Sequence, residues 1–263
     1  MDLGLQGKAA LVCGSSQGLG RAIAEALAAE AVDVVINGRS AKKLDGTRDE
    51  IARSTGARVA AAAGDLTDPA GVAAVVAAAR AAFGRIDILV TNTGGPPSGP
   101  FEAHSAETWH RAIAQNLESV VNLVRAVLPE MKERRWGRIV NVTSISVKQP
   151  VSGLILSNAI RAGVTGLAKT LATEAGPFRI TVNNVAPGYT RTERLVELAH
   201  AISGRSGATI PDVYAGWEKE VPLGRLAEPA ELGAVAAFLC SEKASYITGQ
   251  TVVVDGGWTK GLF

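Results

Sequence analysis

Short, uninterrupted apolar runs alternate with helical stretches along nearly the whole chain, and this alternation restricts the fold more than any other feature. Continuous apolar runs are typical of strands buried on both faces of a parallel sheet. The predicted strands are 9–13, 32–37, 59–64, 88–91, 139–143, 180–185 and 251–254, and the predicted helices are about 18–30, 41–54, 69–83, 105–134, 155–175 and 229–240. Repeated β-α-β units need right-handed crossovers, which put helices on both faces. The sequence therefore predicts an α/β protein with a doubly wound, mainly parallel seven-stranded sheet.

We expect a single domain over residues 1–263, because no linker, internal repeat or low-complexity segment interrupts the pattern. One stretch breaks the rhythm: from Thr192 to Pro222 a helical piece is followed by residues 203–207 and another short helix. It follows the carboxyl end of a strand, where open α/β sheets bind their ligands. We interpret residues 192–222 as a substrate lid, and a structural insertion without function is the alternative.

The charge balance excludes one class of function. With 27 basic and 25 acidic residues the net charge is +2, too small for an electrostatic grip on nucleic acid. Cys13 and Cys240 form no Cys-x-x-Cys or Cys/His cluster, so we expect neither a disulfide nor a metal site. No run approaches the roughly 20 apolar residues that cross a membrane, and residues 1–5 lack the features of a signal peptide. We expect a soluble cytoplasmic protein.

The segment Gly14-Ser15-Ser16-Gln17-Gly18-Leu19-Gly20 follows the first predicted strand and opens the first predicted helix. Glycines allow the backbone to turn tightly and to approach a pyrophosphate closely. The free N–H groups of a helix N-terminus attract the same phosphates. At this strand-to-helix junction, the pattern indicates dinucleotide binding.

The spacing Gly-x-x-x-Gly-x-Gly resembles that of the short-chain dehydrogenase/reductase family. The resemblance continues nearly end to end, in the order Asp65-Leu66, Asn92-Thr93-Gly94-Gly95, Asn116, Ser144, then 187–192, 222–225 and 254–257. It implies a Rossmann fold and an oxidoreductase similar to the 3-oxoacyl-[acyl-carrier-protein] reductases. It also implies a homotetramer and a small-molecule or acyl-thioester carbonyl substrate.

The resemblance further assigns roles to individual residues. Asn116 matches the active-site asparagine of the family, and Ser144 matches the catalytic serine that polarises the substrate carbonyl. The residues expected to hold the nicotinamide cofactor are Gly14, Ser16, Gln17, Gly18, Leu19, Gly20, Asp65, Leu66, Asn92, Gly94, Arg161, Pro187, Gly188, Thr190 and Thr192.

The residues after the second predicted strand indicate which cofactor is used. An acid there would accept hydrogen bonds from the adenosine ribose and repel a 2′-phosphate. The chain has Asn37, Gly38, Arg39 and Ser40 instead. Arg39 offers a charge-assisted fork to phosphate and Ser40 adds a hydroxyl, so NADP(H) is favoured over NAD(H). A surface role for Arg39 is the alternative.

The proton donor of the family is missing. In the family, a tyrosine follows the catalytic serine by thirteen residues and a lysine follows four residues later, which leads from Ser144 to Ser157 and Arg161 here. Residues four apart share one helical face, so the geometry is kept while the chemistry changes. A phenol has a pKa of about 10, whereas an aliphatic hydroxyl is a far weaker acid and arginine does not relay protons readily.

Three explanations stay open at this stage. The chain is a working reductase with another acid, such as Ser157, Ser144, water or Tyr189. Alternatively, it is a slow or inactive nucleotide-binding relative that acts as a sensor or scaffold. The third explanation is different chemistry in the same pocket, such as dehydration or isomerisation.

Overall fold

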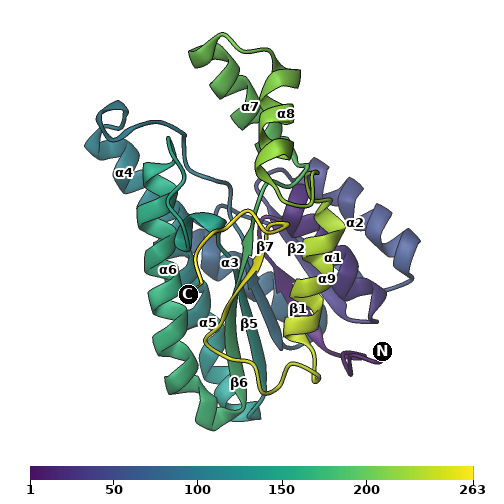
Figure 1. Cartoon of the computed structure of the whole chain (residues 1–263). Helices are drawn as coiled ribbons and strands as arrows, with labels where there is room; N and C mark the ends of the chain where they lie inside the picture. The colour runs from purple at the N-terminus through teal and green to yellow at the C-terminus, as the bar shows by residue number, and fades with distance from the viewer. Residues whose placement is uncertain (263) are drawn as a thin grey trace.

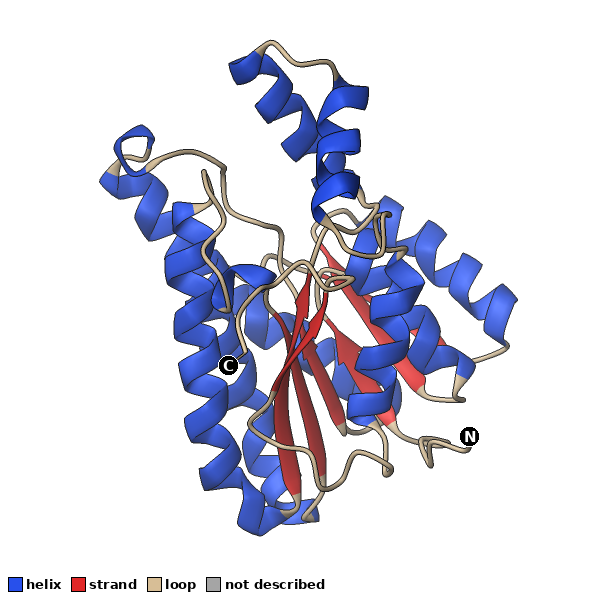
Figure 2. Cartoon of the chain, in the orientation of Figure 1, coloured by secondary structure: helices blue, strands red, loops and turns tan. Residues whose placement is uncertain are grey.

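The computed structural model describes residues 1–262 and contains a seven-stranded sheet in the order β3-β2-β1-β4-β5-β6-β7, in which every pairing is parallel (Figures 1 and 2). The strands are β1 (Ala9–Val12), β2 (Asp33–Gly38), β3 (Val59–Ala63), β4 (Ile88–Thr91), β5 (Gly137–Val142), β6 (Ile180–Pro187) and β7 (Thr251–Val254). The predicted doubly wound parallel sheet is therefore confirmed, and each predicted strand lies within a few residues of its place.

Helices cover both faces of this sheet (Figure 1). The α-helices are α1 (Gly18–Ala29), α2 (Ala41–Thr55), α3 (Pro69–Phe83), α4 (Ala106–Ile113), α5 (Ser119–Arg134), α6 (Ile155–Ala175), α7 (Glu193–Ser206), α8 (Ile210–Glu220) and α9 (Pro229–Cys240). The short helical turns are η1 (Phe101–Ala103), η2 (Ala114–Glu118), η3 (Ile145–Val147) and η4 (Gly176–Phe178). None of the helices within residues 1–262 is long and apolar enough to cross a membrane.

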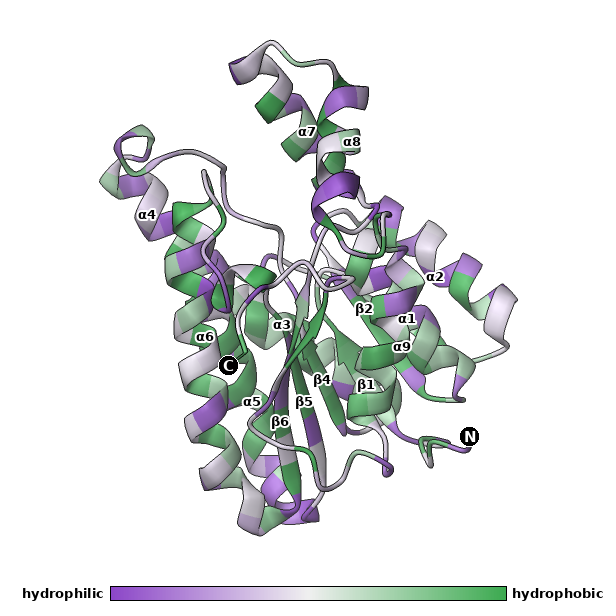
Figure 3. Cartoon of the chain, in the orientation of Figure 1, coloured by the Kyte–Doolittle hydropathy of each residue, from purple (hydrophilic) through white to green (hydrophobic). Residues whose placement is uncertain are grey.

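Successive strand residues point to opposite faces and so contribute to two separate cores. Leu11 and Val35 pack with α3, α5 and α6, whereas their neighbours Val12 and Val34 pack with α1, α2 and α9. The strands at the centre of Figure 3 are mostly green, with a few purple segments. Both-sided burial explains why the strands read as continuous apolar runs in the sequence.

The helical stretch predicted over 105–134 is confirmed, but the sequence did not predict the π-helical turn within it. The helix begins at Ala106, and a π-helical turn, η2, interrupts it at Ala114–Glu118 before α5 begins. The buried Asn116 side chain lies in this turn and donates from Nδ2 to the Ala112 carbonyl at 3.1 Å. Such local side-chain bonds compete with the regular ladder, and π turns are frequent at functional sites.

The segment after β6 folds into α7 and α8, which rise above the carboxyl edge of the sheet (Figure 1). The first helix of this segment was predicted to end before residue 203, which was too early. Helix α7 continues through Ser206, and Gly207 caps it with φ +74°. The two helices share a small apolar cluster that includes Leu195, Val213 and Trp217. This cluster is separate from the two main cores.

Candidate active site

The strand order reverses between β1 and β4, so the loops that follow these two strands lead away from one another. In open α/β sheets the crevice at such a point binds ligands. A cavity of about 260 Å³ opens here. Its walls come from the loops that follow β1, β4, β5 and β6 and from the start of α6 and α7. The lining residues are Gly14, Gln17, Gly18, Leu19, Asn92, Thr93, Gly94, Gly95, Pro96, Val142, Thr143, Ser144, Ile145, Val151, Leu154, Ser157, Arg161, Pro187, Gly188, Tyr189, Thr190, Thr192, Glu193, Arg194, Leu195 and Leu198. The site therefore joins the glycine-rich turn to the Ser144–Arg161 region.

The glycine-rich turn has no room for side chains. Gly14 has φ +55°, and a Cβ there would lie 2.7 Å from the Asn92 carbonyl oxygen. A Cβ on Gly20 would collide with the Gly14 carbonyl. The Asn92 side chain fixes the turn by donating from Nδ2 to that carbonyl at 3.0 Å. The helix that follows has no side-chain cap at its first N–H groups, so this cradle fits a phosphate group.

The buried Asn37 side chain holds the ends of three strands together. It donates from Nδ2 to Ala62 O at 3.0 Å and accepts a 3.4 Å bond from Gly14 N. Ser16 lies nearby, with its carbonyl accepting from Thr47 Oγ1 at 3.0 Å. In the sequence, Asn37 is notable only for standing where an acid would select NAD(H), and its structural role depends on contacts that no sequence pattern reveals.

The residues proposed to select the cofactor lie at the rim. Arg39 is exposed, and Ser40 Oγ caps α2 by accepting from Lys43 N at 3.4 Å. Lys43 also lines a shallow depression beside Ser16 and Gly18. The pKa of Asp65 is lowered by hydrogen bonds from the backbone and hydroxyl of Thr67 and, more weakly, by the charge of Arg39. Arg39 therefore lies on the side of the site where the adenine-contacting pair is expected.

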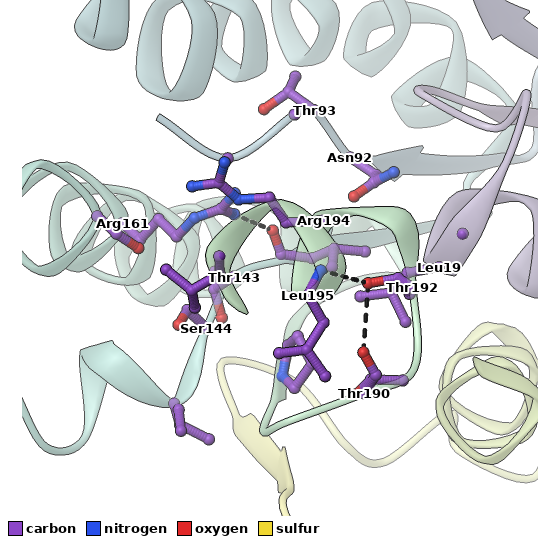
Figure 4. Close-up of a pocket in the computed structure, with 18 of the residues that line it drawn as sticks. Leu19, Asn92, Thr93, Thr143, Ser144, Arg161, Thr190, Thr192, Arg194 and Leu195 are labelled. Atoms are coloured by element: carbon purple, nitrogen blue, oxygen red, sulfur yellow. Dashed lines mark hydrogen bonds between the residues drawn. The ribbon is translucent and has the colours of Figure 1, made fainter. Parts of the chain in front are cut away.

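The segment after β6 forms the opposite wall of the cavity. Thr192 caps α7, with Oγ1 accepting from Leu195 N at 3.4 Å and donating to Thr190 O at 3.3 Å (Figure 4). Gly188 lies close against the backbone of Asp255, where a Cβ would be 2.8 Å from the Asp255 Cα. Residues 187–192 are thus held against the C-terminal segment.

Ser144, Ser157 and Arg161 all line the cavity, as the sequence analysis expected. Ser144 Oγ accepts from Ser146 N at 3.2 Å, and Ser146 Oγ lies 3.2 Å from Ser157 Oγ. Ser157 is 7% exposed and Arg161 is 9% exposed. Arg161 Nη1 donates to the Val142 carbonyl at 2.7 Å. The hydroxyls of Ser144 and Ser157 thus line the same cavity as a buried guanidinium.

Burial, together with the smaller effect of the positive charge of Arg194, lowers the pKa of Arg161 to about 10. Burial removes water from the guanidinium, and few protein partners replace it, so the charged form is less favoured than in solution. The two arginine side chains extend toward one another across the pocket (Figure 4).

Arg194 is the residue that the sequence analysis missed. Its Nη2 donates to Pro96 O at 2.5 Å, and its Nε lies 2.8 Å from the position that a Cβ on Gly95 would take. A signal was present: a cation in the first turn of a helix opposes the helix dipole. Such a local conflict is most often found at functional sites.

Several other predicted residues do not line the cavity among the described residues: Ser16, Gly20, Arg39, Ser40, Asp65, Leu66 and Asn116. Gly20 lies beneath the glycine-rich turn, and Leu66 is buried in the core. Asn116 is 3% exposed, and its Oδ1 accepts from Thr93 Oγ1 at 3.1 Å. It therefore touches the cavity wall through Thr93.

Tyr189 lines the cavity, but its hydroxyl is directed elsewhere. It donates to Glu220 Oε2 at 3.5 Å, and its ring stacks on Trp217 with centroids 5.1 Å apart. Burial, together with the Glu220 carboxylate, raises the pKa of this phenol. A phenol with a raised pKa is a weaker acid, so this arrangement does not favour Tyr189 as the proton donor.

Comparisons with known proteins agree with this geometry. A family profile described as Enoyl-(Acyl carrier protein) reductase matches residues 14–259. The chain is 39% identical over 257 residues to the oxidoreductase UcpA of Salmonella typhimurium, covering 97% of this chain and 95% of that one. It is 37% identical over 255 residues to the 3-oxoacyl-[acyl-carrier-protein] reductase FabG of Escherichia coli K12, covering 97% and 98%.

Solved structures of related proteins have the same fold. The crystal structure of L-sorbose reductase from Gluconobacter frateurii, complexed with NADPH and L-sorbose, matches with a TM-score of 0.94 and 34% identity over 100% of both chains. Profile, sequence relatives and fold all agree over nearly the full length. The chain belongs to the short-chain dehydrogenase/reductase family.

Proposed function

We propose that this protein is an NADP(H)-dependent oxidoreductase that reduces a carbonyl, 3-oxoacyl-like substrate with an atypical proton donor. The observation that carries the proposal is the continuity of one cavity, which runs from the closed glycine-rich turn at Gly14 to Ser144, Ser157 and Arg161. The relative that is complexed with NADPH and L-sorbose has the same fold. The comparison with FabG supports the 3-oxoacyl class.

When bound, NADPH supplies a hydride for the carbonyl carbon. The chain supplies the rest of the chemistry. Gly14, Gly18 and the first N–H groups of α1 would hold the phosphates, and Asn92 keeps the turn in shape. Ser144 would donate a hydrogen bond to the carbonyl oxygen and stabilise the charge that develops there.

Arg39 supports the preference for NADP(H) over NAD(H). It is exposed at the end of β2, and no salt bridge forms to it within the described residues. Its guanidinium can therefore take a 2′-phosphate in a bidentate, charge-assisted bond. The Ser40 hydroxyl uses its oxygen to cap α2, which leaves its hydrogen to donate to the same group.

We further propose that Ser157 and Arg161 occupy the places of the family's tyrosine and lysine. Arg161 would then provide fixed positive charge beside the developing alkoxide. The proton would come from the Ser144 hydroxyl, from the Ser157 hydroxyl, which is paired with Ser146 Oγ, or from water that they hold. General acid assistance is typically worth about 10²–10⁴-fold, so this enzyme should be slow compared with relatives that have the phenol.

The absence of the family's tyrosine and lysine also favours a second candidate function, an NADP(H)-binding sensor or scaffold that transfers no hydride. Loss of an efficient acid removes catalysis without removing the cradle. The two candidates differ in one measurement: consumption of NADPH, followed by absorbance, across a panel of carbonyl compounds at saturating enzyme. A direct NADPH titration must accompany it, because binding without consumption indicates the second candidate.

Three wider expectations belong to this proposal. Residues 1–263 would act as a single domain. Residues 192–222, which contain α7 and α8, would form a lid that closes on the substrate. The protein would assemble as a homotetramer, as the family resemblance implies. Light scattering coupled to size-exclusion chromatography checks the assembly.

A further inference from the structure

We propose that the substrate carries a carboxylate, and that Arg161 and Arg194 bind this carboxylate between them. The inference rests on the proposed function, because it describes the substrate of the same site. It identifies the ligand class as a carbonyl compound with an acidic group and an apolar body. Carboxylates are the natural partners of paired guanidinium groups.

Arg161 has unused hydrogen-bonding capacity inside the protein. It is 9% exposed, yet its guanidinium makes one hydrogen bond within the described residues, from Nη1 to Val142 O. The carbonyl compensates one donor but carries no negative charge. Buried cations are normally paired with acids. The remaining donors of Arg161 border the cavity and are positioned to meet an anion there.

Arg194 lines the same cavity as Arg161, although its position in the helix is electrostatically unfavourable. It lies in the first turn of α7, where the helix dipole disfavours a cation. The absence of a side chain at Gly95 makes room for its Nε, and the Pro96 carbonyl anchors its Nη2. Its one ion pair among residues 1–262 is with Glu197 at 3.3 Å, an acid that is 66% exposed. An exposed ion pair of this kind contributes little to stability.

The charge balance of the cavity favours an anion at this end. Among the lining residues Glu193 is the one acid, and its Oε2 lies 3.4 Å from the position of a Cβ on Gly18, at the glycine-rich end. Burial is the main reason for the lowered pKa of Arg161, and the positive charge of Arg194 acts in the same direction. A carboxylate bound between the two arginines would attract both guanidinium groups and offset their repulsion.

Apolar side chains complete the description of the ligand. The wall around the arginines includes Ile145, Val151, Leu154, Leu195 and Leu198. This surface suits an aliphatic or aromatic body and offers no acidic group that would repel a carboxylate. The combination indicates a small apolar oxo acid.

The test measures binding before activity. NADPH is titrated first, and the NADPH-saturated protein is then titrated by calorimetry with acetate, hexanoate, benzoate and phenylacetate, each against its amide. We expect at least one acid to bind about 10- to 100-fold more tightly than its amide. Arg194→Gln should remove most of this preference, and Arg194→Lys should restore part of it. Arg205→Gln is the matched control, because Arg205 lies on the same helix, is exposed and does not line the cavity.

The outcomes separate the two proposals. If NADPH binds and no acid is preferred over its amide, the carboxylate inference is overturned while the proposed function stands. Equal losses in Arg194→Gln and Arg205→Gln would also overturn it, since general charge would then explain the effect. If NADPH does not bind, both proposals fall. Reduction of benzoylformate at a lower KM than its methyl ester, with the difference lost in Arg194→Gln, would support it.

Discussion

Replacing Ser157 with tyrosine and Arg161 with lysine should raise the rate of carbonyl reduction. The two residues lie one turn apart on α6 and both line the cavity. A phenol at 157 would extend into the open cavity of about 260 Å³. The lysine at 161 and the nearby Arg194 would both lower the pKa of this phenol toward the working pH, because opposite charge favours the phenolate.

The magnitude follows from what is gained and lost. An efficient general acid is worth about 10²–10⁴-fold in rate, which corresponds to about 2.7–5.4 kcal/mol in the barrier. The double variant loses the bond between Ser146 Oγ and Ser157 Oγ and the bond from Arg161 to Val142 O. At about 1 kcal/mol for a neutral bond and up to about 3 for a charged donor, the loss is about 2–4 kcal/mol. A typical domain tolerates this loss of stability.

The assay compares turnover of NADPH on a carbonyl panel for the parent protein, each single variant and the double variant. Circular dichroism and NADPH titration serve as controls for folding and binding. Each single change should do less than the pair, since an unassisted phenol keeps its high pKa and a lysine without a phenol activates nothing. No gain in a folded, NADPH-binding double variant would refute the reasoning. High parental activity abolished by Ser157→Ala would show a distinct mechanism.

Three further predictions concern the cofactor site and its support. Arg39→Asp should narrow or reverse the preference for NADPH over NADH by about 1–3 kcal/mol, and equal affinities in the parent protein would contradict the assignment. Gly20→Ala should abolish NADPH binding while circular dichroism reports a folded protein, because its Cβ would collide with the Gly14 carbonyl; retained affinity would show that the phosphates lie elsewhere. Burial raises the pKa of both Cys13 and Cys240 to about 12, so about one thiol in 10⁴ is ionised at pH 8. Neither should react with an aromatic disulfide reagent at pH 8 until the protein unfolds, and rapid labelling of the native protein would disprove their burial.

The sequence predicted the sheet well because both-sided burial leaves a direct trace in the residues. Continuous apolar runs such as 9–13 and 88–91 match β1 and β4, whose residues are all buried. Periodicity predicted the helical stretch over 105–134 but not the π-helical turn inside it, because periodicity averages over a local defect. At this turn the Asn116 side chain bonds to the Ala112 carbonyl, and no composition rule records such a bond.

The candidate site was predicted in part, for a similar reason. Motif spacing located Ser144, Ser157 and Arg161, and all three line one cavity. Arg194 was missed because its importance comes from a distant partner, the backbone of Gly95 and Pro96, which a linear reading cannot place beside it. Its position against the helix dipole was the one local signal.

Transfer of a labelled hydride tests the central claim most directly. NADPH carrying deuterium at both C4 positions is incubated with excess protein and a panel of carbonyl compounds, benzoylformate among them, and the products are analysed by mass spectrometry. We predict one deuterium on the carbinol carbon of at least one product, formed slowly and lost in Ser144→Ala. Tight NADPH binding with no deuterium in any product would contradict the oxidoreductase proposal and indicate a nucleotide-binding sensor or scaffold.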